Sequence, residues 1–248
     1  MEDMFFAQGF NAARDRLWQL DLWRRQGEGK LAEAFGPRFV DQDRAARLFL
    51  YRGDLEAELS SYHPQGKEIL TSFTNGINAY IDLTRARPEL LPIEFQITGA
   101  RPGHWSVTSP LIRIFGLTRN LSREVNLAQL VNIMGPDAVG RVSYFQPPTR
   151  LEVPKGLDLS LINSSAIASY NLARAGVVFQ ASDFTRKLSK DVRLRWAKRL
   201  SVPPIGESDN PYQPMYESNN WTISGRLSAT GMPILAGDPH RAQSVPSL

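Results

Sequence analysis

The chain has 248 residues, of which 42% are hydrophobic, with 29 lysines and arginines, 25 aspartates and glutamates, and no cysteine. The lack of cysteine excludes disulfide frameworks and thiol nucleophiles, and the three histidines (His63, His104 and His240) are too widely spaced for a histidine-rich metal site. No stretch approaches 18 uncharged apolar residues, so we predict no membrane span, and the first residues lack the basic start and apolar run of a signal peptide.

The net charge of +4 is concentrated in one segment. Residues 181–200 hold seven basic and two acidic side chains, a local charge of +5, which leaves −1 for the other 228 residues. A nucleic-acid-binding protein is expected to spread its basic side chains across a folded face. We therefore predict no nucleic-acid partner.

The first two hundred residues read mainly as helix. An apolar stripe at helical spacing predicts a first helix from about Phe10, and Gly36-Pro37 supplies a stop signal after it. The stripe consists of Phe10, Ala13, Leu17 and Leu20. The charged residues beside it are expected to form an opposite, polar face: Arg14, Asp15, Arg16, Arg24 and Arg25.

A second stripe, which includes Ile77 and Tyr80, predicts a helix that ends near Pro88. Gly76 lies inside this helix, where glycine costs about 1 kcal/mol relative to alanine. Such a glycine indicates close packing against a neighbour. Residues 90–105 contain two prolines and two glycines and are expected to be extended or looped.

Two further helices are predicted before a change of pattern. One covers residues 111–134 and stops at Gly135-Pro136, and the other is a basic amphipathic helix over 183–200. Residues 145–165 are expected to form loops. Residues 201–216 contain four prolines and are expected to form a flexible connector.

Beyond the connector the sequence predicts a β-hairpin. Residues 218–224 alternate like a strand, 227–231 supply turn chemistry, and 232–237 form the returning strand. A turn centred near Ala229 would place Ser218 opposite His240, with Cβ atoms about 5 Å apart. If the chain were cut before Ser218, the serine would carry a free α-amino group of pKa about 7.7–8.0. Such an amine suits general-base activation of a hydroxyl nucleophile.

These residues resemble a known family. Ser218-Asn219-Asn220-Trp221 and Asp238-Pro239-His240, with a glycine-bearing turn between them, are similar to the start of the β subunit of the penicillin acylase family of N-terminal-nucleophile hydrolases. Blocks upstream resemble the α subunit of the same family. These blocks are Gly9-Phe10, Ala13–Gln19, Arg24-Arg25, Gly29–Glu33, Asn75–Tyr80, Leu91–Phe95 and Trp105.

The resemblance implies roles for particular residues. Ser218 would attack the Glu217–Ser218 bond during maturation and later the substrate amide, and His240 would occupy a hydrogen-bonding position beside it. Arg241 would lie where relatives present an acyl-pocket residue, which would favour a polar or anionic acyl group. Arg119 aligns with a mobile pocket residue, and Glu124 with a carboxylate that helps hold a structural calcium ion.

The resemblance also implies an architecture and an activity. We expect an α+β fold, a partial αββα sandwich, in which this chain is mostly helical with a hairpin near its C-terminus. Residues 1–180 would form the α-subunit-like region, 181–217 a spacer removed on maturation, and 218–248 the start of the β subunit. The two subunits would form a heterodimer from one precursor.

The implied reaction is hydrolysis of a linear amide in a small N-acyl substrate, of the β-lactam antibiotic or acyl-homoserine-lactone type. It needs no catalytic cofactor, and a periplasmic or secreted location follows from the resemblance. Family β subunits extend far beyond Leu248, where the oxyanion-hole donors and other calcium ligands would lie. We therefore expect the chain to be a piece of a longer precursor, inactive by itself.

Two other hypotheses remain open from the sequence. One is a non-catalytic helical module that binds anionic surfaces through the basic helix 183–200, as such helices often do. The other is an inactive truncated fragment. Salt-dependent binding to acidic vesicles or nucleic acid would favour the first of these.

Overall fold

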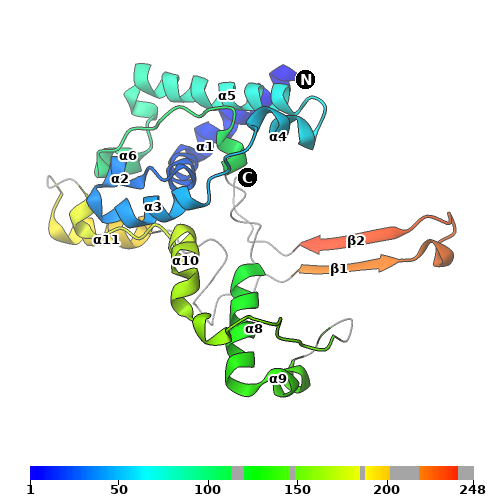
Figure 1. Cartoon of the computed structure of the whole chain (residues 1–248). Helices are drawn as coiled ribbons and strands as arrows, with labels where there is room; N and C mark the ends of the chain where they lie inside the picture. The colour runs from blue at the N-terminus through cyan, green and yellow to red at the C-terminus, as the bar shows by residue number, and fades with distance from the viewer. Residues whose placement is uncertain (113–119, 144, 146–148, 185–187, 202–217, 240–248) are drawn as a thin grey trace. The chain divides into compact units, whose positions relative to one another are not determined.

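The computed structural model describes the chain except for residues 113–119, 144, 146–148, 185–187, 202–217 and 240–248. The chain forms two units, residues 1–206 and residues 207–248. The described part of the first is helical, and the second contains a two-stranded antiparallel hairpin (Figure 1). This confirms the predicted composition of mostly helix with a hairpin near the C-terminus. Among the described helices, none is long and apolar enough to cross a lipid bilayer.

The described part of the chain contains α-helices along most of its length and two strands near its C-terminus. They are α1 (Glu2–Glu28), α2 (Leu31–Phe35), α3 (Val40–Leu48), α4 (Leu55–Tyr62), α5 (Gly66–Ala86), α6 (Ile93–Thr98), α7 (Ser109–Ile112), α8 (Asn120–Met134), α9 (Pro136–Val142), α10 (Ala168–Arg174), α11 (Lys190–Leu200), β1 (Ser218–Ile223) and β2 (Ile234–Pro239). Helix α1 begins well before the predicted Phe10 and is interrupted at Arg16, whose φ of −140° is not helical.

Helices α1 and α5 pack against each other through a pair of glycines. A Cβ atom on Gly76 would lie 2.0 Å from the carbonyl oxygen of Phe6, and one on Gly9 would lie 1.9 Å from that of Phe73. Only a residue without a side chain lets the two backbones approach this closely. The close packing predicted for Gly76 is therefore confirmed, and the glycine's cost to helix propensity is offset by contact between the helices.

Aromatic side chains from distant parts of the sequence meet at the centre of the helical unit. The ring centroid of Trp18 lies 5.1 Å from that of Phe95 and 5.9 Å from that of Phe35, both edge to face. The ring of Phe179 lies 6.1 Å from Trp18 and 5.1 Å from Phe35. Such pairs stabilise a core beyond the area that they bury. They bring residues 177–179 into the same core as α1, α2 and α6.

The predicted ends of two helices are confirmed. Helix α5 ends at Ala86, just before Pro88, and α8 ends at Met134, before Gly135-Pro136. The expectation of loop for residues 90–105 is wrong for α6. The proline and glycine that suggested a loop instead mark the two ends of α6. Pro92 precedes its first turn, and Gly99, at φ +77°, ends its last one.

The predicted basic helix is shorter than expected. Its described helical part is α11, which begins at Lys190 after the hydroxyl of Ser189 accepts a hydrogen bond from the Val192 N–H. Residues 181–183 form a separate 3₁₀ turn. Phe184, which falls within the range predicted as helix, lies outside α11 and is buried in the core.

Candidate functional site

The hairpin carries the residue expected to do the chemistry. Ser218 is the first residue of β1, and the backbone register pairs it with Pro239, while Trp221 pairs with Ala236. The predicted pairing of Ser218 with His240 is therefore wrong by one residue. The physical reason is the turn, in which residues 225–227 form a 3₁₀ segment that shifts the centre of pairing off Ala229.

Contacts within the turn fix this register. A Cβ atom on Gly225 would lie 2.3 Å from the carbonyl oxygen of Gly231, and Gly231 itself adopts a positive φ of 71°. The hydroxyl of Ser228 donates a hydrogen bond of 2.6 Å to the carbonyl oxygen of Met232. These contacts close the loop between β1 and β2 and hold Ser218 at one end of the ladder.

The two faces of the hairpin differ in chemistry. Strand alternation puts positions 221 and 223 on one face, with Ala236 and Ile234 opposite them, and this half of the face, next to the turn, is apolar. Position 218 shares the other face with positions 220 and 222. Trp221 is 56% exposed, so the apolar face is uncovered within the described residues. A two-stranded hairpin is marginally stable unless such a face packs against another element.

Most of the other predicted site residues lie outside the described part of the chain. They are Glu217, His240, Arg241 and Arg119. Glu124 is described, on α8, with an exposed side chain. Calcium takes six to eight oxygen ligands, whereas the described residues hold no group of three histidine, aspartate or glutamate side chains placed to ligate a metal ion. Those residues alone do not fit a calcium site, and the role of Glu124 stays a prediction.

The other blocks that carry the resemblance form connections within the helical unit. Gly29 ends α1 at φ +64°, and its N–H bonds to carbonyl oxygens of the last turn. The carboxylate of Asp43 accepts hydrogen bonds from the N–H groups of Leu31 and Ala32 at 2.8 and 2.7 Å. It thereby caps the first turn of α2 from α3. The Gly29–Glu33 block is thus a corner between three helices.

Asn78 and Trp105 form a second connection. The side-chain amide of Asn78 donates to the carbonyl oxygen of Trp105 and accepts from the Trp105 N–H, both at 2.8 Å. This reciprocal pair fixes the loop after α6 against α5. The two residues are 27 positions apart in the sequence, and the side chain of Asn78 pairs both backbone polar groups of Trp105.

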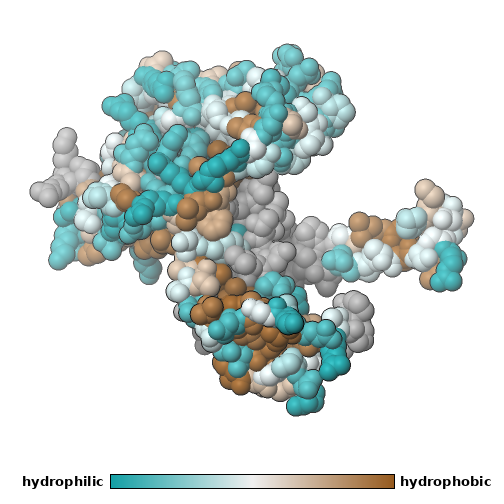
Figure 2. Space-filling view, in the orientation of Figure 1, coloured by the Kyte–Doolittle hydropathy of each residue, from teal (hydrophilic) through white to brown (hydrophobic). Residues whose placement is uncertain are grey.

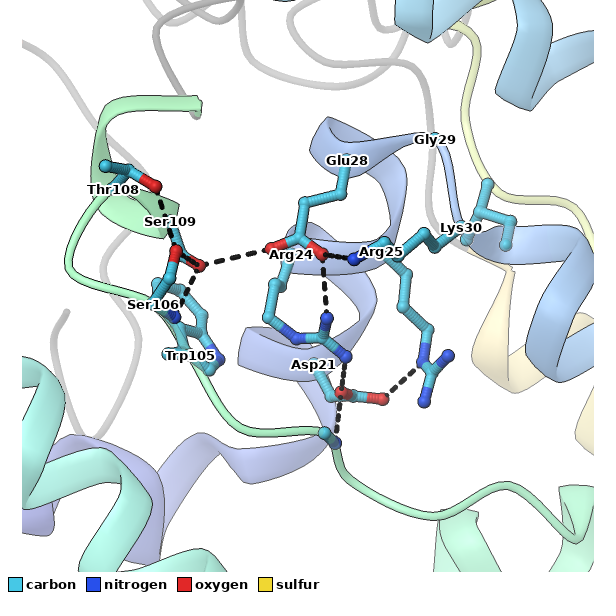
Figure 3. Close-up of polar contacts among 12 residues, drawn as sticks. Asp21, Arg24, Arg25, Glu28, Gly29, Lys30, Trp105, Ser106, Thr108 and Ser109 are labelled. Carbon is cyan, nitrogen blue, oxygen red and sulfur yellow. Dashed lines mark hydrogen bonds and ion pairs between the residues drawn. The ribbon is translucent and has the colours of Figure 1, made fainter. Parts of the chain in front are cut away.

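A buried ionic network in α1 was not predicted from the sequence (Figure 3). The carboxylate of Asp21, 1% exposed, accepts hydrogen bonds from Arg24 at 2.8 Å, Arg25 at 2.7 Å and the Gly103 N–H at 3.0 Å. Glu28 accepts from Arg24 at 2.9 Å. The expectation that Arg24 and Arg25 face solvent is wrong, because the loop after α6 covers them.

The signal for this network was present in the spacing. Asp21 and Arg25 are four residues apart and Arg24 and Glu28 are also four apart, so all four side chains lie on one side of α1. Such a pattern is usual for a solvated helix face, and periodicity alone does not reveal the segment that covers it. Glu28 also accepts a hydrogen bond of 3.1 Å from the hydroxyl of the buried Ser109.

Exposed apolar side chains gather over α8 and α9 (Figure 2). Ile133 is 78% exposed, Val142 71%, Met134 46% and Leu130 44%. Contiguous apolar surface of this kind marks interaction sites in soluble proteins. Among the described residues, none packs over these four side chains to bury them.

An apolar groove of about 340 Å³ lies between α4, α5 and α7. Its walls are mainly aliphatic, and the ring of His63 supplies a polar edge whose Nδ1 accepts a hydrogen bond from the Gln65 N–H. The lining consists of Tyr62, His63, Gly66, Ile69, Leu70, Pro110 and Leu111.

We compared the sequence with family models and with known proteins. A family model described as penicillin amidase matches residues 1–248. Penicillin G acylase of Escherichia coli is 34% identical over 103 residues, which are 41% of this chain and 12% of that protein. Acyl-homoserine lactone acylase QuiP of Pseudomonas aeruginosa is 26% identical over 250 residues, 99% of this chain and 26% of the relative.

Two further comparisons concern a proenzyme and a solved structure. Penicillin acylase 2 proenzyme of Pseudomonas sp. (strain SE83) is 26% identical over 254 residues, 99% of this chain and 28% of the relative. A thermostable penicillin G acylase from Alcaligenes faecalis is similar in structure, with a TM-score of 0.47 and 22% identity over 60% of this chain and 87% of that one. The chain thus spans about a quarter of the length of the two relatives that it matches nearly end to end.

Proposed function

Because the chain belongs to the penicillin amidase family, we propose that it is the nucleophile-bearing part of an acylase precursor that hydrolyses N-acyl amides. Ser218, at the first position of β1, is the proposed nucleophile. The observation that carries the proposal is this serine at the start of a strand in a chain that matches the family over its whole length. The αββα sandwich, of which the hairpin would be one part, belongs to the same proposal.

The first proposed step is maturation. The Ser218 hydroxyl oxygen attacks the carbonyl carbon of Glu217, and the acyl group moves from nitrogen to oxygen. Water then hydrolyses the resulting ester, which leaves a carboxylate on Glu217 and a free α-amino group on Ser218. An α-amino group has a pKa of about 7.7–8.0, so a large share of it is neutral near pH 8 and able to accept a proton.

The second step is acyl transfer from the substrate. The amine takes the proton of the Ser218 hydroxyl while the oxygen attacks the amide carbonyl carbon, and the proton passes to the leaving amine. An acyl-serine ester forms, and water activated by the same amine releases the carboxylic acid. Donors for the oxyanion are expected beyond Leu248, and removing even one typically costs ~10²–10³ in rate.

The proposed substrate is a small N-acyl amide. The named relatives are penicillin acylases and acyl-homoserine lactone acylases, so the leaving group would be a β-lactam nucleus or a homoserine lactone. We propose that Arg119 and Arg241 contact the acyl group and that His240 hydrogen-bonds near Ser218. The mature enzyme would be a heterodimer, and Glu124 would contribute one ligand to a structural calcium ion.

Release of the amine from N-acyl substrates by the complete gene product tests the function. We expect Ser218→Ala to abolish the release of amine from both a penicillin and an acyl-homoserine lactone. The matched control is Ser224→Ala, an exposed serine that directly follows the same strand, which should retain activity within about twofold. Undiminished hydrolysis by Ser218→Ala would contradict the proposal.

A binding function for α11 is the second candidate, and one observation favours it. Lys190, Arg195, Lys198 and Arg199 are exposed and form no ion pair among the described residues. Binding to acidic vesicles that weakens with salt and disappears when these four charges are neutralised would support this function. Vesicle binding that survives their neutralisation would contradict it.

A further inference from the structure

The described residues between 175 and 201, a range that includes more than half of the predicted spacer, contribute side chains to the core of the helical unit. The side-chain amides of Gln26 and Gln42 both donate to the carbonyl oxygen of Ala175, at 2.9 and 2.8 Å. The two glutamines come from α1 and α3 and are themselves buried. This carbonyl oxygen, with its two lone pairs, fixes the point where the segment enters the core.

The apolar side chains of the segment belong to the main hydrophobic cluster. Val177 is fully buried, Phe179 is 4% exposed and Phe184 is 3% exposed, with the last two rings 5.9 Å apart. Ala197 and Leu200, on the inner side of α11, are each 6% exposed in the same cluster. The cluster therefore continues through α11 and includes positions on both sides of the predicted boundary at residue 181.

Polar contacts close the segment on itself. The hydroxyl of Ser201 accepts a hydrogen bond of 2.9 Å from the Phe179 N–H and donates one of 2.7 Å to the carbonyl oxygen of Ala197. Arg193 donates to the carbonyl oxygen of Ala181 at 3.3 Å. Hydrogen bonds thus join α11 and Ser201, which follows it, to Phe179 and Ala181 at the 3₁₀ turn.

A further ion pair ties the segment to the rest of the unit. Arg38, which follows α2, pairs with Asp183 and also donates to the carbonyl oxygen of Val178 at 2.7 Å. The Asp183 side chain is 7% exposed and accepts a second hydrogen bond from the Gln180 N–H. Excision from residue 181 onward would leave Arg38 without its carboxylate and would uncover Phe179.

From these contacts we infer that residues 181–201 remain in the mature α subunit, so that any peptide removed during maturation begins after Ser201. The inference rests on the proposed function, because it presupposes cleavage before Ser218. It narrows the spacer predicted over 181–217 and leaves the basic charge of α11 on the mature protein. Helix α11 is then a permanent part of the α-subunit core that ends just before the excised segment.

The mass of the α subunit tests the inference in the purified, matured gene product. We expect an α-chain whose C-terminus lies at or beyond Ser201, together with a β-chain that begins at Ser218. An α-chain that ends before Ser201, with Ser218 as a free terminus, would overturn the inference and leave the proposed function intact. A chain that stays uncut before Ser218 would overturn both.

Thermal unfolding of the matured protein gives a second readout. Leu200→Ala should lower the melting temperature by on the order of 5 °C, because it removes buried methyl groups from the cluster. The matched control is Leu194→Ala, on the same helix but 49% exposed, which should shift it by less than about 2 °C. If α11 were excised, neither residue would be present and both matured variants would melt like the parent, which would overturn the inference.

Discussion

In the helical unit several residues that resemble the acylase family are buried, among them Leu17, Trp18 and Phe95, whereas in the hairpin Trp221 is 56% exposed. Asn78 holds Trp105, and Gly76 admits α1. These residues determine how helices meet, and none of them forms a nucleophile with a base. The helical unit has its own core, while the hairpin presents a proposed nucleophile on a strand whose apolar face is uncovered.

The largest loss of stability is expected when the buried ionic network of α1 is broken, and breaking a surface ion pair of the same helix serves as the comparison. Asp21→Ala should lower the free energy of unfolding by about 3–5 kcal/mol, because it leaves the buried Arg25 without its carboxylate and takes from Arg24 one of its two carboxylate partners. Asp15→Ala removes a carboxylate that pairs with Arg14 at the surface and should cost less than about 1 kcal/mol. Urea denaturation measures both, and equal losses would contradict a structural role for the network.

The helix crossing predicts opposite signs for two glycine substitutions. Gly76→Ala should destabilise the unit by about 1–3 kcal/mol, because the new methyl group would collide with the Phe6 carbonyl oxygen. Gly140→Ala, in α9, meets no atom within 4 Å and should stabilise by up to about 1 kcal/mol through helix propensity. The same denaturation series measures both changes, and a stabilising Gly76→Ala would argue against the close approach of α1 and α5.

The core also predicts a pH dependence. Burial raises the pKa of Tyr80 above its ordinary value, with a smaller opposing effect from Arg14. Because the folded-state pKa is higher than that of the unfolded chain, the stabilisation is complete below pH ~10 and is lost as the pH rises through the raised value. Between pH 9 and 11 the parent should lose more stability than Tyr80→Phe. Parallel pH profiles for the two proteins would contradict the burial argument.

The smallest effect is expected in the hairpin. Trp221→Ala should change the free energy of unfolding of the 248-residue chain by less than about 0.5 kcal/mol, because the side chain is largely exposed. Urea denaturation followed by far-ultraviolet circular dichroism, which reports on the helices, measures this. A loss comparable with that of Asp21→Ala would mean that the stability of the helical unit depends on the hairpin.

Local signals in the sequence predicted much of the helical unit. Periodicity and breakers located the ends of α5 and α8, and Gly76 indicated the crossing. The same breakers misled at α6, where Pro92 and Gly99 flank a helix. Breakers report where a helix begins or ends, and a short helix between two of them is indistinguishable from loop by periodicity.

Hydrophobic periodicity and residue spacing did not predict contacts between residues that are far apart in the sequence. The i, i+4 spacing of Arg24 and Glu28 does not show that a loop some 80 residues later covers them. The register of β1 and β2 depends on a 3₁₀ segment in the turn, and one residue of difference replaces His240 by Pro239 opposite Ser218. Ser218 itself was singled out by its motif, and its role remains a prediction.

The N-terminal sequence of the polypeptides in the matured gene product tests the central claim most directly. The account predicts a polypeptide that begins Ser218-Asn219-Asn220-Trp221, which is absent when Ser218→Ala is expressed in its place. A protein that releases amine from N-acyl substrates while Ser218 remains inside an uncut chain would contradict it.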